Sequence, residues 1–405
     1  MSADLQQPAA RVQALHLLLA LLMASRWVVY GFTDVALTAV LRKSGVSLNE
    51  ISLLMGVGFL FMLKFLWAPL VDRVQLFGRA GYTPWFLLMQ IACAISLLGL
   101  LALEPGRDFY AVLGLLVAAS VAATFRDIAM DGLAVKLLPQ EQRASANGWM
   151  SAGFMLGLVL GGGVLLLAYE QIGWSGAVLA IVAGTLLPVP IMFMFKEPEG
   201  RAAPAAPGFA LIASLRQFFR QPGNLQWTGL ILVMAMAGIT GPSLLTVMLV
   251  DNGWSLARVG TVTTIIGPLL AAALSLVAGY VFERISRRAA IVAMLLAGAV
   301  LSLAQIPVAT DSYPVWLTMG VVVLAVVVAS LTNIAQKIVV TDKAATTADF
   351  GSNFTVQASI AQVGGILAHM AAPALAGVTG YPAVLAVGGV LGIVAALMLA
   401  RYRYL

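Results

Sequence analysis

The sequence has very little of the chemistry on which most enzymes depend. Its 405 residues include one cysteine, two histidines and only 10% charged residues. The single cysteine, Cys93, excludes a disulfide or a cysteine-based metal site within one chain, and two histidines argue against a histidine-rich metal centre. The sequence also shows no Ser/His/Asp or nucleotide-binding constellation. We therefore expect neither an enzyme nor a bound cofactor.

Hydrophobic residues take the place of the missing charges and make up 61% of the chain. The mean hydropathy is +0.97, whereas about a quarter of the residues in an ordinary soluble domain are charged. Apolar runs of about 18 to 25 residues recur, and each can cross a hydrocarbon core about 30 Å thick as a helix. The runs are continuously apolar, while the strands of a membrane barrel would alternate. The sequence predicts an all-α integral membrane protein.

We predict twelve transmembrane helices in two bundles of six, with both termini in the cytoplasm. The predicted spans are 14–41, 50–71, 83–103, 109–136, 144–169, 175–196, 225–250, 256–281, 289–309, 314–340, 350–376 and 381–401. In this orientation about sixteen Lys and Arg residues lie inside and about four outside, as the positive-inside rule requires. The net charge of +6 then faces anionic lipid headgroups, so it indicates no nucleic-acid partner.

A polar stretch near the middle of the chain predicts the boundary between two domains. It reads "KEPEGRAAPAAPG" (196–208) and is followed by an amphipathic segment suited to the inner membrane surface. We therefore predict an N-terminal six-helix bundle over 1–196, a cytoplasmic linker over 197–224 and a C-terminal six-helix bundle over 225–405. We expect a monomer.

The two predicted bundles repeat one another in sequence. "GVSL" at 45–48 matches "GWSL" at 253–256, and "PLVDR" at 69–73 matches "YVFER" at 280–284. A parallel repeat of this kind is the plan of transporters whose halves rock around a central site.

The repeat and two further motifs resemble a known transporter family. The acid-Arg pairs Asp72-Arg73 and Glu283-Arg284 are similar to the repeated cytoplasmic gating motif of the major facilitator superfamily. More narrowly, "KFLWAPLVDR" (64–73) and "DIAMDG" (127–132) resemble stretches of the AmpG-type muropeptide permeases and of related importers of iron-siderophore complexes. One departure is Arg126, where the family pattern has a polar uncharged residue, often Gln.

This resemblance implies a secondary transporter of the bacterial inner membrane that works by alternating access. The compact chain is more similar to the siderophore branch, so we expect proton-coupled import of an iron-siderophore complex. The alternative is a muropeptide or another organic solute. A transport-inactive sensor is disfavoured, because nothing resembling a signalling domain is attached.

Ionisable residues deep in the predicted helices are the main candidates for function. They are Arg26, Asp34, Lys64, Arg126, Asp127 and Asp131. Each costs about 3 kcal/mol at the bilayer centre, so facing lipid would cost roughly 18 kcal/mol together, more than the about 5 to 15 kcal/mol that stabilises a typical domain. They must therefore face protein, water or one another.

Depth along the helices, at about 1.5 Å per residue, predicts which charges pair. Lys64 shares a level with Asp131, and Arg26 shares a level with Asp127. Arg126 points about 100° away from Asp127 around the helix, which leaves it without an acid at its own level. Two interpretations stay open: the charges are structural ion pairs, or an aspartate exchanges a proton while Arg26 or Arg126 holds an anionic group of the substrate.

The candidate site follows from these charges and from the resemblance, by which helices 1, 4, 7 and 10 line the cavity and place Asn333 and Gln336 opposite Asp127. The predicted substrate-binding residues are Arg126, Arg26, Tyr30, Trp27, Phe125, Asn333, Gln336 and Gln357. The predicted proton-coupling residues are Asp127, Asp131, Asp34 and Lys64, and the predicted gating residues are Asp72, Arg73, Glu283 and Arg284. Glycines 153, 157 and 161 form a GxxxGxxxG face that predicts close helix packing.

Overall fold

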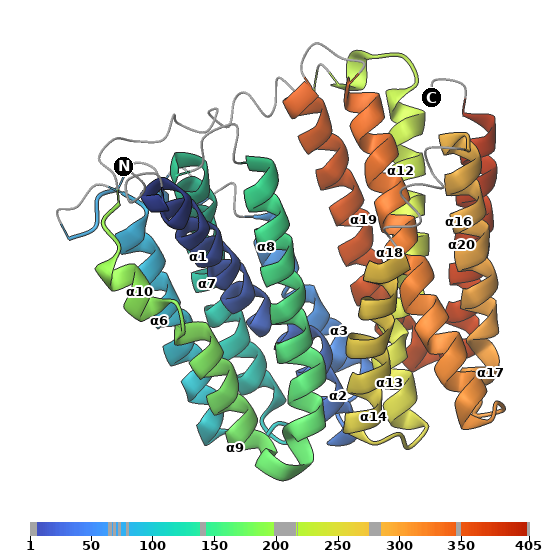
Figure 1. The fold of residues 1–405 in the computed structure, drawn as a ribbon. Coiled ribbons are helices and arrows are strands. Elements are labelled where there is room, and N and C mark those ends of the chain that lie inside the picture. Colours follow the sequence, from blue (N-terminus) through green and yellow to red (C-terminus); the bar gives the residue numbers. More distant parts are fainter. Residues whose placement is uncertain are drawn as a thin grey trace. The chain divides into compact units, whose positions relative to one another are not determined.

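The protein is helical throughout the part of the chain that the computed structural model describes (Figure 1). The described residues are 6–63, 67, 70–71, 74–77, 81–137, 143–197, 216, 218–274, 285–345 and 350–402. Within these ranges no extended strand occurs. The prediction of an all-α protein is confirmed.

The helices of the first half follow the predicted spans 83–103 and 109–136 closely and the others in part. In chain order they are α1 (Gln6–Gly31), the π-helix η1 (Phe32–Leu37), α2 (Thr38–Lys43), α3 (Leu48–Gly56), α4 (Phe59–Met62), α6 (Thr83–Leu98), the 3₁₀ turn η2 (Gly99–Ala102), α7 (Phe109–Leu137), α8 (Arg143–Leu158), the π-helix η4 (Val159–Val164), α9 (Leu165–Leu186) and α10 (Val189–Met194).

The helices of the second half are also long and apolar. They are α12 (Asn224–Thr240), α13 (Pro242–Asp251), α14 (Leu256–Gly260), the π-helix η5 (Thr261–Ile266), α16 (Arg287–Ala304), α17 (Ile306–Ala309), α18 (Val315–Ala345), α19 (Phe350–Thr379) and α20 (Tyr381–Arg401). Pro242 begins α13 directly after Gly241, because proline has no N–H to continue the hydrogen-bond ladder of α12.

Ten helical segments of the described chain are long and apolar enough to cross a membrane. One of them, Gly148–Met194, is 47 residues long, about twice what a single span needs, and it contains the non-helical Gly173. The predicted span 50–71 is described only in part, as the shorter apolar helix Leu48–Met62. The protein is a multi-pass membrane protein, and the exact count of twelve stays a prediction.

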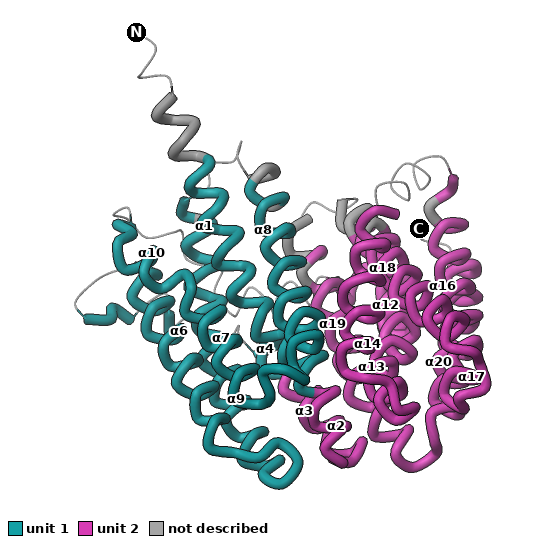
Figure 2. The backbone as a smooth tube through the Cα atoms, turned by 60° about the horizontal axis from the view of Figure 1, so that its bottom comes forward, with its two compact units in different colours: residues 1–37, 59–205 teal, residues 38–58, 206–405 magenta. Residues whose placement is uncertain are grey.

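The chain forms two compact units (Figure 2). Unit 1 comprises Met1–Leu37 and Phe59–Ala205, and unit 2 comprises Thr38–Gly58 and Ala206–Leu405. The segment Thr38–Gly58 therefore groups with the second half of the chain by its contacts. Along the chain, unit 1 is interrupted after the π-helix η1 and resumes at the start of α4.

Polar contacts hold the segment 38–58 within unit 2. Arg42 on α2 donates from Nε and Nη2 to the two carboxylate oxygens of Asp251 on α13, at 2.5 and 2.6 Å. The Tyr381 hydroxyl at the start of α20 donates to the same carboxylate at 2.6 Å. On α3, the Ser52 hydroxyl donates to the carbonyl oxygen of Met370 on α19 at 2.7 Å. These bonds join α13 and α19 to the α2–α3 segment, and Tyr381 adds α20 through the shared carboxylate of Asp251.

The predicted glycine face packs closely, as expected. Gly153, Gly157 and Gly161 lie against α1, where a Cβ on each would collide with the backbone carbonyl oxygens of Ala20, Ala24 and Val28 respectively. Because only a glycine leaves room there, α1 and α8 approach each other at backbone distance. This contact holds the charged part of α1 in place.

Gly161→Ala should lower the free energy of unfolding by at least about 1–3 kcal/mol, the usual cost of overpacking a core. The added methyl would meet backbone atoms that cannot rotate away. Thermal unfolding in detergent measures the effect. Gly148→Ala on α8 is the matched control, since nothing lies within 4 Å of its added methyl. Equal unfolding temperatures for the two variants would contradict the close packing.

Candidate functional site

One face of the first helical segment carries polar and aromatic side chains that are partly buried or exposed. Its residues are Arg26, Trp27 and Tyr30 on α1 and Thr33 and Asp34 on η1, whose spacing of three or four residues marks one side of a helix. Leu22, Ala24, Val28 and Phe32, on the other sides, are buried. A face with Arg and Asp would be costly against lipid, so it is suited to water or to a polar solute.

Arg26 and Arg126 both contact Asp127, at the level where the motif "FRDIAMDG" lies on α7. Arg26 Nε is 2.9 Å from Asp127 Oδ2. Arg126 donates to Asp127 Oδ1 from Nη2 at 2.9 Å and from Nε at 3.2 Å. Asp127 is completely buried and Arg126 is 2% exposed. The predicted pairing of Arg26 with Asp127 is confirmed.

The prediction that Arg126 has no acid partner is wrong. The residues adjacent in sequence do leave the helix in different directions, but the long arginine side chain turns back and reaches its neighbour Asp127. Its third nitrogen, Nη1, donates to Gln90 Oε1 on α6 at 3.2 Å. The Gln90 amide in turn donates to the carbonyl oxygen of Thr185 on α9. Arg126 thus joins three helices of unit 1 from a buried position.

Sequence reasoning missed Gln90, although a polar side chain in the middle of an apolar span is a usable signal. Gln90 is fully buried, and its amide both accepts from Arg126 and donates to α9. A buried amide that has partners on both sides positions the guanidinium beside it.

The contact of Arg26 with Asp127 differs in kind from that of Arg126. The Arg26 N–H does not point at Asp127 Oδ2, so this oxygen has an ionic neighbour but no hydrogen bond among the described residues. Arg26 is also the more accessible cation, with 21% of its side chain exposed. Two guanidinium groups and one carboxylate leave this cluster with a formal charge of +1.

An aromatic cluster begins beside Arg26 on the partly exposed face of α1. The Arg26 guanidinium carbon lies 5.7 Å from the centre of the Trp27 ring, within cation–π range. Trp27 packs edge-to-face against Tyr30 at 4.8 Å and against Phe154 of α8 at 4.4 Å. Tyr30 is 40% exposed. The predicted residues Arg26, Trp27 and Tyr30 are therefore brought together.

Phe125, the remaining aromatic candidate of the first half, lies in a different setting. Its ring stacks on Trp67 at 5.5 Å and on Trp85 at 5.8 Å. All three belong to a hydrophobic cluster of unit 1. Packing between helices accounts for Phe125, and its substrate role stays a prediction.

The structure describes only some of the other charged residues predicted for the site. Asp34 lies in the π-helix η1 and Asp131 on α7, both partly buried and both with interactions. A π-turn in a helix is often a functional position. Lys64, Asp72, Arg73, Glu283 and Arg284 lie outside the described residues, so the pair Lys64–Asp131 and the gating pairs stay predictions.

The three amide candidates of the second half have different environments. Gln357 on α19 is fully buried and accepts from Trp227 Nε1 at 2.6 Å, which is a packing role. Gln336 on α18 donates to the carbonyl oxygen of Met234 at 3.1 Å. Asn333, by contrast, is exposed on α18. Of the three, Asn333 has the most exposed side chain, and its substrate role stays a prediction.

An anchoring site near the end of the first half was also missed by sequence reasoning. Glu197 accepts the backbone N–H groups of Tyr82 and Thr83 at the start of α6, at 2.9 and 2.8 Å, and the Lys136 ammonium at 2.8 Å. Burial alone raises the pKa of Glu197, but Lys136 and these N–H groups outweigh it and hold the pKa below its usual value. The carboxylate therefore stays ionised at neutral pH.

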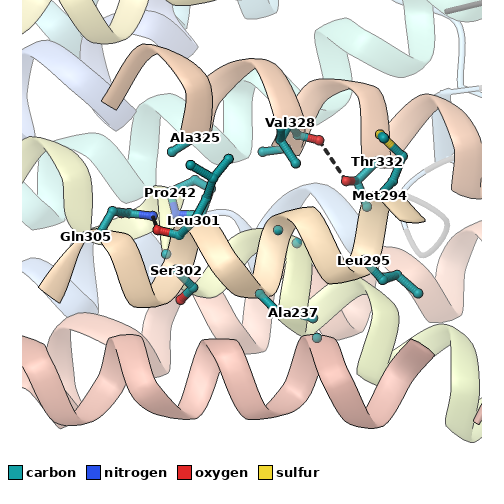
Figure 3. A pocket seen from close by; sticks show the side chains of 16 residues that line it. Ala237, Pro242, Met294, Leu295, Leu301, Ser302, Gln305, Ala325, Val328 and Thr332 are labelled. Carbon is teal, nitrogen blue, oxygen red and sulfur yellow. Dashed lines mark hydrogen bonds between the residues drawn. The ribbon is translucent and has the colours of Figure 1, made fainter. Parts of the chain in front are cut away.

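A cavity inside unit 2 is too small to receive an organic solute (Figure 3). It holds about 30 Å³ between α12, α16 and α18, which suits one water molecule. Within the described ranges, no three His, Cys, Asp or Glu side chains gather closely enough to hold a metal ion. The partly exposed face of α1, with its charged and aromatic side chains, is the candidate site for a solute.

Comparisons with known proteins agree with a multi-pass helical membrane protein. The sequence profile described as Major Facilitator Superfamily matches residues 17–346 and 226–405. The chain is 29% identical over 240 residues to the "Anhydromuropeptide permease" of Escherichia coli (strain K12), which covers 57% of this chain and 48% of that protein. It is 25% identical over 149 residues to the "Putative transporter AmpG 2" of Rickettsia felis, with 36% of each covered. The chain therefore spans about half the length, or less, of these curated relatives.

Solved structures share the fold at low sequence identity. A bacterial homologue of the human lysosomal transporter Spinster, in an inward-facing and occupied conformation, has a TM-score of 0.69 at 18% identity, covering 98% of this chain and 97% of that one. The nucleoside transporter NupG has a TM-score of 0.69 at 12% identity, covering 95% and 99%. These likenesses concern the fold alone.

Proposed function

This chain belongs to the Major Facilitator Superfamily, and from that premise we propose that it imports a muropeptide-type solute across the bacterial inner membrane by alternating access. A transporter needs a polar path through the hydrocarbon core. The observation that carries the proposal is the partly exposed polar face of α1 and η1 beside the positively charged cluster of Arg26, Arg126 and Asp127. Such a face is suited to an anionic, ring-bearing solute.

The similarity to the anhydromuropeptide permease supports this substrate over a siderophore. The motif "DIAMDG" resembles both the muropeptide permeases and the siderophore importers, and only the compact chain length favoured the siderophore branch. The chain spans only about half the length of the permease, so length carries little weight. The relative's name therefore moves the muropeptide alternative to first place, and a ferric siderophore becomes the competing outcome of the test.

Proton coupling is part of the proposal and rests on the buried carboxylate. Asp127 lies between two cations, of which only Arg26 is accessible. A carboxylate can take up and release a proton in a transport cycle when a cation beside it moves. Asp34 and Asp131 are further candidates, and we place both termini in the cytoplasm from the distribution of basic residues.

Uptake into right-side-out membrane vesicles tests the proposal directly. Labelled anhydromuropeptide should accumulate in right-side-out vesicles when an inward pH gradient is imposed, and a protonophore should abolish the accumulation. Uptake of a labelled ferric siderophore with no uptake of muropeptide would replace the substrate class. Accumulation driven by a sodium gradient alone would replace the coupling ion.

A further inference from the structure

The two arginines beside Asp127 differ in what they can still bind. Arg126 is 2% exposed and donates from all three of its nitrogens, to Asp127 and to Gln90. Arg26 approaches Asp127 through Nε alone. Within the described part of the chain, its terminal nitrogens donate no hydrogen bond. Arg26 therefore keeps a planar pair of donors that no described residue engages, on a side chain that is 21% exposed.

The charge of the cluster favours one further anion. The two guanidinium groups of Arg26 and Arg126 share the carboxylate of Asp127, so these three residues carry a formal charge of +1 in a setting where isolated charge is costly. The acids nearest along the same helical segments, Asp34 and Asp131, have interactions of their own. A solute carboxylate at Arg26 neutralises that excess. The guanidinium fork matches a carboxylate with two parallel hydrogen bonds, which a single amide oxygen cannot reproduce.

The aromatic rings near Arg26 indicate the chemistry of the rest of the solute. Trp27 supports the guanidinium from one side at 5.7 Å, and Tyr30 and Phe154 pack against Trp27. Ligand sites commonly combine such apolar and aromatic surfaces with a few well-placed polar groups. The arrangement suits a carboxylate attached to an acyl or ring-bearing body, and it suits a small inorganic anion less well.

We propose that Arg26 is the binding site for a carboxylate of the transported solute, and that this carboxylate replaces Asp127 Oδ2 as the anionic partner of Arg26. The inference rests on the proposed function and names the chemistry of its substrate site. Asp127 keeps both of its hydrogen bonds from Arg126 during the exchange, so it is not left unpaired. Arg126 is the fixed cation and Arg26 is the exchangeable one.

Binding to the purified protein in lipid nanodiscs tests the inference with two probes. One is the anhydromuropeptide, and the other is the same compound with its carboxylates converted to amides. The wild-type protein should bind the acid at least tenfold more tightly. Arg26→Gln should weaken binding of the acid by about 10- to 100-fold, the range for losing hydrogen bonds to a charged group, and leave binding of the amide unchanged.

Two further variants separate binding from folding. Arg26→Lys keeps the charge without the fork and should retain a reduced preference for the acid. Arg258→Gln is the matched control, because Arg258 lies over Trp254 at 5.4 Å in the same cation–π arrangement. It should bind both probes as the wild type does. A thermal unfolding profile of each variant identifies any loss of fold.

The outcomes distinguish the inference from the proposed function. If the wild type binds acid and amide equally, or if Arg26→Gln keeps the wild-type preference, the carboxylate site is overturned while muropeptide import stands. If the wild type binds neither probe, the muropeptide function fails. The same acid and amide comparison with a carboxylate-bearing ferric siderophore then decides the site: a preference lost in Arg26→Gln supports it, and the absence of a preference overturns it.

Discussion

Arg126→Gln should lower the free energy of unfolding by about 3–5 kcal/mol, the cost of removing one partner from a buried ion pair. The variant would lose both hydrogen bonds to the completely buried Asp127 and the bond to Gln90. A glutamine is too short to replace all three. We expect little folded protein after extraction, and for the folded fraction an unchanged affinity for solute. The measurements are fluorescence-detected size exclusion and thermal unfolding.

A double-mutant cycle gives this prediction its control. Removing both charges in Arg126→Gln/Asp127→Asn leaves no buried excess at this pair, so the double variant should be more stable than the sum of the single losses predicts. Coupling between contacting charged residues is typically 0.5–3 kcal/mol. Additive losses would contradict a direct pairing, and a selective loss of solute affinity in Arg126→Gln would return the substrate role to Arg126.

Asp127→Asn should abolish uphill uptake, because the amide keeps the shape of the side chain but cannot carry a proton. Asp127 is the buried anion between Arg26 and Arg126. Its replacement raises the formal charge of the cluster from +1 to +2, so solute carboxylate should still bind while coupling is lost. The measurement is accumulation of labelled solute under a pH gradient, beside exchange of internal for external solute without one.

The comparison of the two transport modes makes the result specific. Loss of uphill uptake with retained exchange supports a coupling role for Asp127. Loss of both modes in a well-folded variant indicates that the carboxylate also holds Arg26 in place. Accumulation at the wild-type level in Asp127→Asn would end the coupling proposal.

The location of the helices was largely predictable, because hydropathy along the chain is a local property. The predicted spans 83–103, 109–136 and 381–401 correspond to Thr83–Ala102, Phe109–Leu137 and Tyr381–Arg401. The pairing of Arg26 with Asp127 was predictable for a related reason. Depth in a membrane helix grows by about 1.5 Å per residue, so counting from the helix ends brings matched residues to one level.

The same counting could not predict the environment of Arg126 or of Gln357. Residue spacing gives the direction in which a side chain leaves its helix, but not where a long, flexible side chain ends. Arg126 turns back to Asp127, and Gln357 is covered by its bond to Trp227. Both had been candidates for contact with solute, whereas Arg26, Tyr30 and Asn333 are the candidates that keep exposed surface.

The sequence by itself determined that this is a multi-pass membrane protein and that the ionisable side chains in its apolar helices must avoid lipid, since composition is a property of the chain alone. Helical rise, another local property, also matched Arg26 with Asp127. Only the tertiary structure decided which partners each charged side chain contacts and how far it is buried. It placed Arg126 in the buried interior of unit 1 and left Arg26 on an accessible face. The physical reason is that burial and the donors left unused depend on neighbouring helices, which no single segment specifies.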